Sequence, residues 1–265
     1  MRVQRFIPIL IFSILAPASV SAQQTSNTAT KDQQAVTILG QCLQAAGGLQ
    51  AMGAIQDFTG TGNVTYFWAG QQVQGQVTVR GMGSLYFRLD ATLPEGARSW
   101  AVRGVNGSTK ETSGQVNPIG SYNAINEGTL TLPYSRILTA LNDSSISISS
   151  AQTATLNGRT VYKIQTQKLY SSTVDPLGEF TKWSVENYLI DANTLTLSEM
   201  QDTVRSNDVP KSEYQHEIIF SNYTLANGVL VPYSITERVS GQETWTIQLS
   251  SISFNVGLTD ADFNL

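Results

Sequence analysis

Apolar and polar residues alternate along most of the chain. Phe58, Val64, Tyr66 and Trp68 occupy even positions, while the odd positions from 59 to 65 carry only Thr or Asn. A period of two residues is typical of a β-strand with one buried face. The same alternation recurs at Val77 and Val79, at Leu85, Phe87 and Leu89, and at Trp100 and Val102. The pattern predicts a protein built mainly from half-buried strands.

Turn motifs indicate how these strands are connected. Asn-Gly steps begin at Asn106, Asn157 and Asn227, and each lies between two strand-like runs. This dipeptide readily adopts the positive φ angles of a two-residue hairpin turn, so consecutive strands should pair antiparallel. We predict about eleven strands in one antiparallel sheet, which at that size must be strongly twisted or curled.

Two features near the C-terminus also predict curvature. Apolar residues occupy odd positions from Trp245 to Leu249 but even positions from Ile252 to Val256. One extra residue near Ser250-Ser251 would restore a single apolar face, and such a β-bulge bends its strand. Pro232 has no amide hydrogen for a ladder, so it should lie at a sheet edge, a bulge or a strand start.

Two segments show a helical period instead. Apolar residues at positions 36, 39, 43 and 46 form one face of a helix that begins near Asp32 and ends at Gly47-Gly48. A second helix is predicted over residues 133–142, with Pro133 in its first turn. Residues 113–132 are rich in Gly, Ser and Asn and should form a loop. The lone Cys42, beside the apolar face of the first helix, should be buried.

The N-terminus has the pattern of an export signal. Arg2 and Arg5 precede a short apolar run, and small residues lead up to Ala22. We therefore expect a signal peptide over residues 1–22, cleaved after Ala22, a disordered lead-in over 23–31 and a single domain over 32–265. No transmembrane segment is expected, and the location is periplasmic or secreted.

Charge and cysteine content exclude some function classes. Cleavage would remove two of the 16 basic residues, which leaves 14 against 20 acidic residues and a net charge of −6. A chain with this balance and no basic run is poorly suited to nucleic acid or anionic membranes. One cysteine allows no internal disulfide.

The order of the segments resembles a known family. A helix ending in AAGGLQAM is followed by DFTGTGNV, YFRLDATLPEGARSWAV, the helix YSRILTAL, then LNGRTVYKI, YLIDANTLTLSEM, FSNYTLANGVLVPYSI and FNVGLTDADF. This order resembles uncharacterised exported proteins of acidobacterial type related to the outer-membrane lipoprotein carrier LolA and receptor LolB. The resemblance implies an unclosed half-barrel with helices over its concave side. It also implies a cavity for lipid acyl chains and no catalytic residues.

The residues offer little for catalysis. His216 is the only histidine, and it shares parity with Tyr214, Ile218 and Phe220, which predicts a buried position. One histidine and one distant cysteine cannot build the usual zinc sites, so no metal is expected. A carboxylate pair such as Glu186 and Glu199 could flank a glycosidic bond only at the right separation.

We therefore expect an α+β fold in which helices lie on the concave face of a strongly curved, incompletely closed antiparallel sheet. The expected function is non-enzymatic binding or transport of a lipid or other hydrophobic ligand in the periplasm, without a cofactor and with an envelope protein as a further partner. The hypothetical ligand cavity consists of Tyr66, Trp68, Tyr134, Ile137, Leu138, Leu141, Tyr214, His216 and Ile218. Two alternatives stay open: a structural or protein-interaction module with a filled concavity, and a hydrolase that uses His216 or a carboxylate pair.

Overall fold

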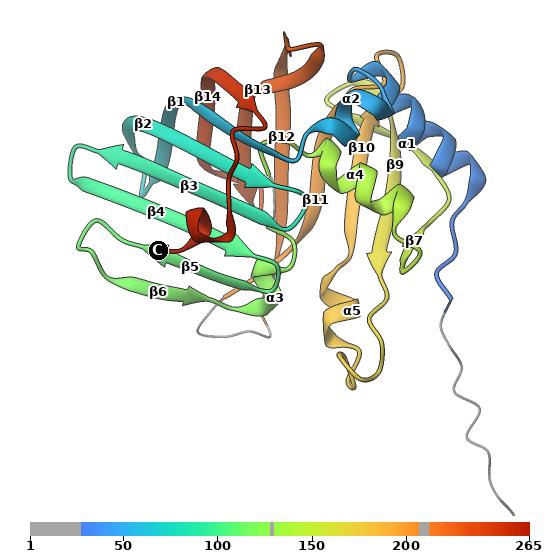
Figure 1. The fold of residues 1–265 in the computed structure, drawn as a ribbon, viewed down its shortest axis with the longest axis horizontal. Coiled ribbons are helices and arrows are strands. Elements are labelled where there is room, and N and C mark those ends of the chain that lie inside the picture. Colours follow the sequence, from blue (N-terminus) through green and yellow to red (C-terminus); the bar gives the residue numbers. More distant parts are fainter. Residues whose placement is uncertain (1–27, 128–129, 207–211) are drawn as a thin grey trace, which may run out of the picture.

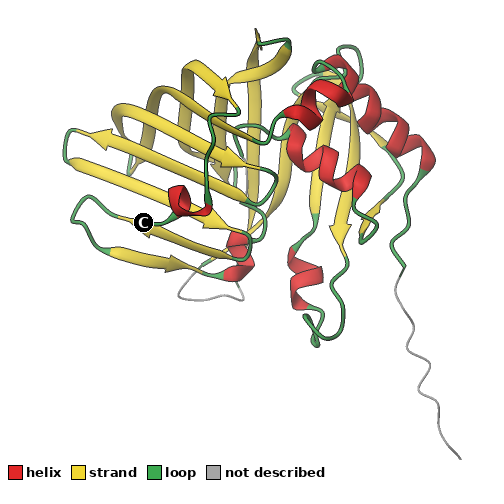
Figure 2. Ribbon diagram, viewed as in Figure 1, coloured by secondary structure: helices red, strands yellow, loops and turns green. Residues whose placement is uncertain are grey.

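The computed structural model describes residues 28–127, 130–206 and 212–265, and within them one antiparallel sheet dominates (Figures 1 and 2). Its spatial order is β6-β5-β4-β3-β2-β1-β14-β13-β12-β11-β10-β9-β7, and β8 pairs with β9. The strands are β1 (Asp57–Trp68), β2 (Gln71–Met82), β3 (Tyr86–Leu93), β4 (Gly96–Arg103), β5 (Asn106–Lys110), β6 (Val116–Ile119), β7 (Ile146–Ile148), β8 (Gln152–Leu156), β9 (Arg159–Lys168), β10 (Glu186–Asp191), β11 (Leu197–Arg205), β12 (Glu213–Ala226), β13 (Val229–Val239) and β14 (Gln242–Phe254).

The helices are few and short. They are α1 (Gln33–Ala45), α2 (Leu49–Ala54), α3 (Ser121–Ala124), α4 (Tyr134–Asn142), α5 (Glu179–Trp183) and the 3-10 turn η1 (Asp260–Phe263). The Asp32 side chain accepts a hydrogen bond of 2.9 Å from the Ala35 amide and so caps α1. Both predicted helices are confirmed, and α2, α3 and α5 are additional. No helix in the described ranges is both long and apolar enough to cross a membrane.

The α+β half-barrel is confirmed, with fourteen strands in the described residues rather than about eleven. The surplus comes from short strands such as β5 to β8, which carry too few residues for a clear alternation. The stretch 113–132, expected to be a loop, contains β6 and α3. The Asn157 and Asn227 turns are confirmed by positive φ angles. The Asn106 turn is wrong, because Gly104 with φ +61° already turns the chain and Asn106 begins β5.

The predicted bulge is present in β14. Thr61 lies opposite Ser251, whereas the next residue, Gly62, lies opposite Leu249, so Ser250 is the extra residue. Its hydroxyl donates to the Thr61 carbonyl at 3.0 Å. A side chain at Gly62 would lie 2.1 Å from the Gln248 carbonyl oxygen, so only glycine fits opposite the bulge.

Pro232 lies where the sheet has a local edge. It pairs with Tyr223 of β12, but β13 begins to pair with β14 only at Ser234. Pro232 therefore has a strand neighbour on one side only, as its missing amide hydrogen requires. Opposite this stretch, Asn222 adopts a φ of +53°, which marks a kink in β12.

The inner face of the sheet has two ends, and the helices occupy one of them. In Figure 1, α1, α2 and α4 lie together beside β9 and β10, away from β3 to β6. The Ala46 carbonyl accepts a hydrogen bond from Leu230, next to the β12–β13 turn. This region is called the helix-packed end. Its core contains fully buried side chains such as Leu39, Leu43, Tyr134 and Ile137.

The other end of the inner face, called the pocket end, is spanned by α3. This helix contacts β5 and β11, which lie far apart in the strand order, so the curved sheet brings its two arms close together without closing. The Asn123 side chain holds the contact: it donates to the Arg205 carbonyl and accepts from the Arg205 amide, each at 2.8 Å.

Three regions bear on the expected domain boundaries. The proposed signal peptide 1–22 and its cleavage site lie outside the described residues. Of the expected lead-in 23–31, residues 28–31 are described, and Lys31 bridges to Ile148 of β7. At the C-terminus, η1 packs on the outer face of the sheet, where Arg88 donates to the carbonyls of Asp262 and Asn264.

Candidate ligand-binding site

The pocket end holds a cavity of about 360 Å³ with aromatic walls. Strand pairing explains why the walls converge. Tyr66 of β1 lies opposite Trp245 of β14, which lies opposite Glu237 of β13. Directly opposed residues point to the same face of a sheet, so these side chains project inward together. The remaining wall comes from Phe67, Trp68, Arg98, Ser99, Trp100, Thr109, Ile119, Asn123, Glu127 and Thr244.

The same strands run from the solid core into this cavity. Along β1, the even positions from Phe58 to Val64 are buried, Tyr66 is partly buried, and Trp68 is 69% exposed at the rim. Along β13, Ile235 is buried in the core and Glu237, two residues on, lines the cavity. The inner face is therefore filled at one end and open at the other.

The aromatic walls are held in place by neighbouring groups. The Arg98 guanidinium lies 5.2 Å from the centre of the Tyr66 ring and pairs with Glu111 at 3.4 Å. Burial raises the pKa of Tyr66 to about 12. Trp100 meets Phe87 edge to face, with ring centres 5.3 Å apart. The cavity surface is thus preformed by the protein.

A buried histidine lies behind the acidic wall. His216 Nδ1 is 2.7 Å from Asp202, and Nε2 is 3.1 Å from Glu237. Burial alone would lower the pKa of His216, but the charges and hydrogen bonds of both carboxylates outweigh it and raise the pKa well above its usual value. Each ring nitrogen therefore faces a carboxylate oxygen, and the two contacts hold the ring in place. Thr244 donates to the other oxygen of Glu237.

Glu127 is the least satisfied group of the cavity wall. It is 8% exposed, and burial raises its pKa to about 8, with His216 acting in the opposite direction. The Trp100 indole lies close enough to lower this pKa slightly. Even so, neither Glu127 Oε2 nor Trp100 Nε1 has a hydrogen-bond partner of normal geometry within the described chain. Buried polar groups without partners are rare in folded proteins.

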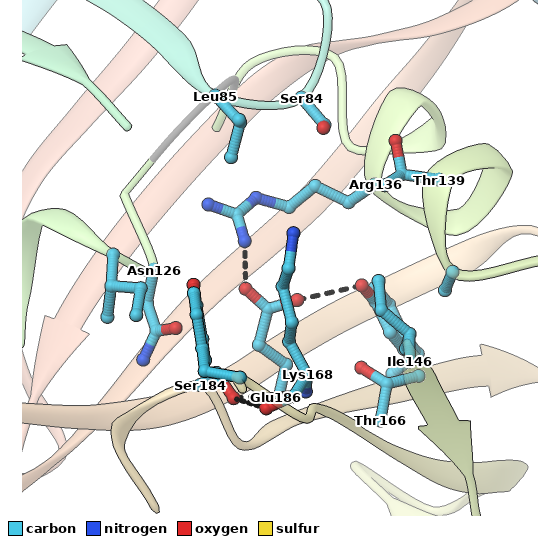
Figure 3. A pocket seen from close by; sticks show the side chains of 14 residues that line it. Ser84, Leu85, Asn126, Arg136, Thr139, Ile146, Thr166, Lys168, Ser184 and Glu186 are labelled. Atoms are coloured by element: carbon cyan, nitrogen blue, oxygen red, sulfur yellow. Dashed lines mark hydrogen bonds and ion pairs between the residues drawn. The ribbon is translucent and has the colours of Figure 1, made fainter. Parts of the chain in front are cut away.

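A second, smaller pocket of about 90 Å³ lies beside α4 (Figure 3). Its centre is an ion pair between Arg136 of α4 and Glu186 of β10, both less than a tenth exposed. The Tyr188 hydroxyl donates to the other Glu186 oxygen at 2.8 Å. Burial raises the pKa of Glu186, and Arg136 opposes that shift. Both Glu186 oxygens have partners, so the polar cluster in this pocket connects α4 to the sheet and leaves neither carboxylate oxygen unpaired.

The structure divides the nine expected cavity residues among five environments. Tyr66 and Trp68 line the large cavity, and His216 lies behind its wall through Glu237. Tyr134, Ile137 and Ile218 are buried in the helix-packed core, Leu138 and Leu141 pack against that core, and Tyr214 is 42% exposed. The expected set is therefore not one contiguous lining.

The geometry argues against hydrolysis by the expected groups. Two acids do lie within hydrogen-bond reach of His216, but they occupy both ring nitrogens, so neither nitrogen can take a proton from a nucleophile. Glu186 shares its face with Tyr188, which pairs with Met200, and Glu199 therefore points to the opposite face. Among the described residues, no group of three or more His, Cys, Asp or Glu is placed to hold a metal ion.

Sequence reasoning missed several wall residues. Glu237 carried a usable signal, since it continues the odd, inward-facing positions of Ile235 and Val231. Glu127 carried none, because it lies beyond α3 in a stretch with no periodicity. Arg98 shares parity with Trp100 and could have been placed beside it.

Comparisons with known proteins identify the fold. No protein-family model and no curated protein matches the chain. Solved structures do match. A LolA superfamily protein from Nitrosomonas europaea has a TM-score of 0.53 at 11% identity, over 88% of this chain and 99% of the other. A putative outer membrane lipoprotein-sorting protein domain from Vibrio parahaemolyticus has a TM-score of 0.51 at 11% identity, over 87% and 96%.

A DUF1329 family protein from Desulfovibrio piger has a TM-score of 0.53 at 12% identity, over 88% of this chain and 98% of the other. At such low identity the matches speak for the fold alone. They confirm the resemblance to the LolA-like half-barrel at that level.

Proposed function

We propose that this protein is a non-enzymatic binder or carrier of an amphipathic ligand such as a lipid, which it holds in the aromatic cavity at the pocket end. The observation that carries the proposal is the cavity of about 360 Å³, with Tyr66, Trp100 and Trp245 in its wall. Concave, largely apolar sites with a few polar groups are where proteins bind small molecules.

The proposed site lies apart from α4, although four residues of this helix, from Tyr134 to Leu141, belong to the expected cavity. Tyr134 and Ile137 of α4 are fully buried, and the pocket beside this helix measures only about 90 Å³. The ligand would enter past the exposed Trp68, at the opposite end of the inner face. The fold match to a lipoprotein-sorting domain supports a lipid or acyl chain as cargo.

The expected signal peptide 1–22 supports a location in the periplasm or outside the cell. In that setting an envelope protein would supply or receive the ligand. Because the helix-packed end is filled, an interaction module whose cavity binds no ligand is the alternative function.

Titration with a fluorescent alkyl probe tests the proposal. Saturable binding is expected for the wild type and should be lost in Thr109→Trp, because the indole would fill the cavity that Thr109 lines. Thr155→Trp, at an exposed position of β8, is the matched control and should bind like the wild type. Absence of saturable wild-type binding would favour the interaction module. Native mass spectrometry of protein purified from its own periplasm would then identify any bound ligand.

A further inference from the structure

The charges around the cavity are not balanced. Arg98 is the one basic residue among the described residues of the wall, and it is already paired with Glu111. On the acidic side, two carboxylates, Asp202 and Glu237, bind the single ring of His216, which carries at most one positive charge. The cluster therefore has an excess of negative charge before Glu127 is counted. A cation would relieve this excess, whereas an anion would increase it.

Glu127 marks the place in the cavity wall where a ligand cation would bind. Its Oε2 atom is buried at the cavity wall beside the Trp100 indole and has no hydrogen-bond partner of normal geometry among the described residues. In the empty protein burial raises the pKa of Glu127 to about 8, but an ammonium group beside it favours the ionised form, so the proton leaves as the cation binds. The resulting carboxylate accepts the hydrogen bonds that the ammonium donates. A ligand donor at this point would satisfy a group that the protein leaves unsatisfied.

The aromatic walls add a second, independent attraction for positive charge. Indole and phenol rings attract cations to their faces. The Tyr66 ring already holds a guanidinium in this way, with Arg98 at 5.2 Å. Trp68, Trp100 and Trp245 line the rest of the same cavity. Rings and acids together form a lining suited to an organic cation with an apolar body.

Building on the proposed function, we propose that the cavity selects amphiphiles whose polar end is an ammonium group, which binds beside Glu127 and is enclosed by the tryptophan and tyrosine rings. The alkyl portion lies along the apolar wall. An opposite arrangement, with neutral Glu127 donating to a ligand carboxylate, would place a second anion beside Glu237 and is disfavoured for that reason.

Three ligands with the same twelve-carbon chain test the selection. Dodecylamine, dodecanol and dodecanoate are titrated at pH 7, below their aggregation concentrations, by isothermal calorimetry. We expect the amine to bind at least about tenfold more tightly than the alcohol, and the carboxylate to bind most weakly. Equal affinities, or tightest binding of dodecanoate, would overturn the ammonium selection while leaving the proposed function intact. No binding of any chain would overturn both.

Substitutions locate the selecting group. In Glu127→Gln the ratio of amine to alcohol affinity should fall to about one, because the amide carries no charge. Glu95→Gln, which removes a charge from an exposed turn, is the control and should keep the ratio of the wild type. Retention of the preference in Glu127→Gln would contradict the assignment. Binding of lysophosphatidylethanolamine with the same dependence on Glu127 would show that the ammonium group belongs to a lipid headgroup. Binding of dodecylamine alone would show that it belongs to a free amine. Both results support selection for an ammonium group.

Discussion

The two ends of the inner face are made from the same strands but differ in what covers them. At the helix-packed end, α1 and α4 bury side chains such as Leu39, Tyr134 and Ile137 completely. At the pocket end, the four-residue α3 is the one helix of the described ranges that spans the arms of the sheet, and Tyr66 remains partly exposed to a cavity. A half-barrel of this kind can therefore be solid at one end and hollow at the other.

Each end also buries charge, and the two clusters differ in completeness. Arg136, Glu186 and Tyr188 satisfy both oxygens of their carboxylate. At the pocket end, His216 is bonded on both sides, but Glu127 Oε2 has no partner of normal geometry in the described part of the chain. A buried polar cluster whose hydrogen bonds are all made helps to fix one structure, whereas a buried group that lacks a hydrogen-bond partner is available to a ligand.

Breaking the ion pair at the helix-packed end should have the largest effect. Arg136→Met leaves Glu186 buried without its cation, so we expect a loss of about 3–5 kcal/mol in the free energy of unfolding. Urea denaturation measures it. Arg136→Met combined with Glu186→Gln removes both charges and should recover most of the loss. If the double variant is as unstable as the single one, the helix is held by packing rather than by this pair.

Two tyrosines compare the ends directly. Tyr134→Ala opens a void in the packed core and should cost about 3 kcal/mol. Tyr66→Ala enlarges an existing cavity, so we expect a cost of about 1 kcal/mol together with weaker binding of the alkyl probe. Urea denaturation and probe titration of both variants distinguish stability from binding. Equal costs would mean that the two ends are packed alike.

The pH dependence of stability should report the state of Glu127. Its pKa is about 8 in the folded protein and near 4.5 when exposed, so the folded state binds more protons between these values. The free energy of unfolding should therefore fall as pH rises from 4.5 to 8, with a slope from this group of at most about 1.4 kcal/mol per pH unit. In Glu127→Gln the slope should be shallower by this contribution. An unchanged slope would show that Glu127 is already ionised.

The smallest effect is expected at the bulge in β14, between the two ends. Ser250→Ala removes the hydrogen bond to the Thr61 carbonyl and should cost about 0.5–1 kcal/mol. Ser253→Ala, at an exposed position of the same strand, is the control and should be close to neutral. Thermal unfolding measures both variants. A large loss at Ser250 would make the bend itself a determinant of the fold.

The first helix of the helix-packed end and the bulge in β14 were easier to predict from the sequence than the pocket end. The period of residues 36 to 46 and the parity switch at Ser250 are local signals, and both correspond to observed elements. Glu127 approaches His216 only after the sheet has curved and Asn123 has joined α3 to β11. Contacts that depend on the curvature of the sheet leave no periodic pattern in the sequence. The grouping of acids and aromatic rings around the cavity could therefore not be predicted from the sequence.

The reactivity of Cys42 in α1 reports how often this helix detaches from the sheet. The thiol is fully buried, and burial raises its pKa to about 12. Reagents that react with thiolates therefore cannot modify Cys42 while α1 is packed on the sheet. Each labelling event therefore requires the helix to detach. The rate of thiol modification under native conditions would measure how often the helix-packed end opens, without any engineered label.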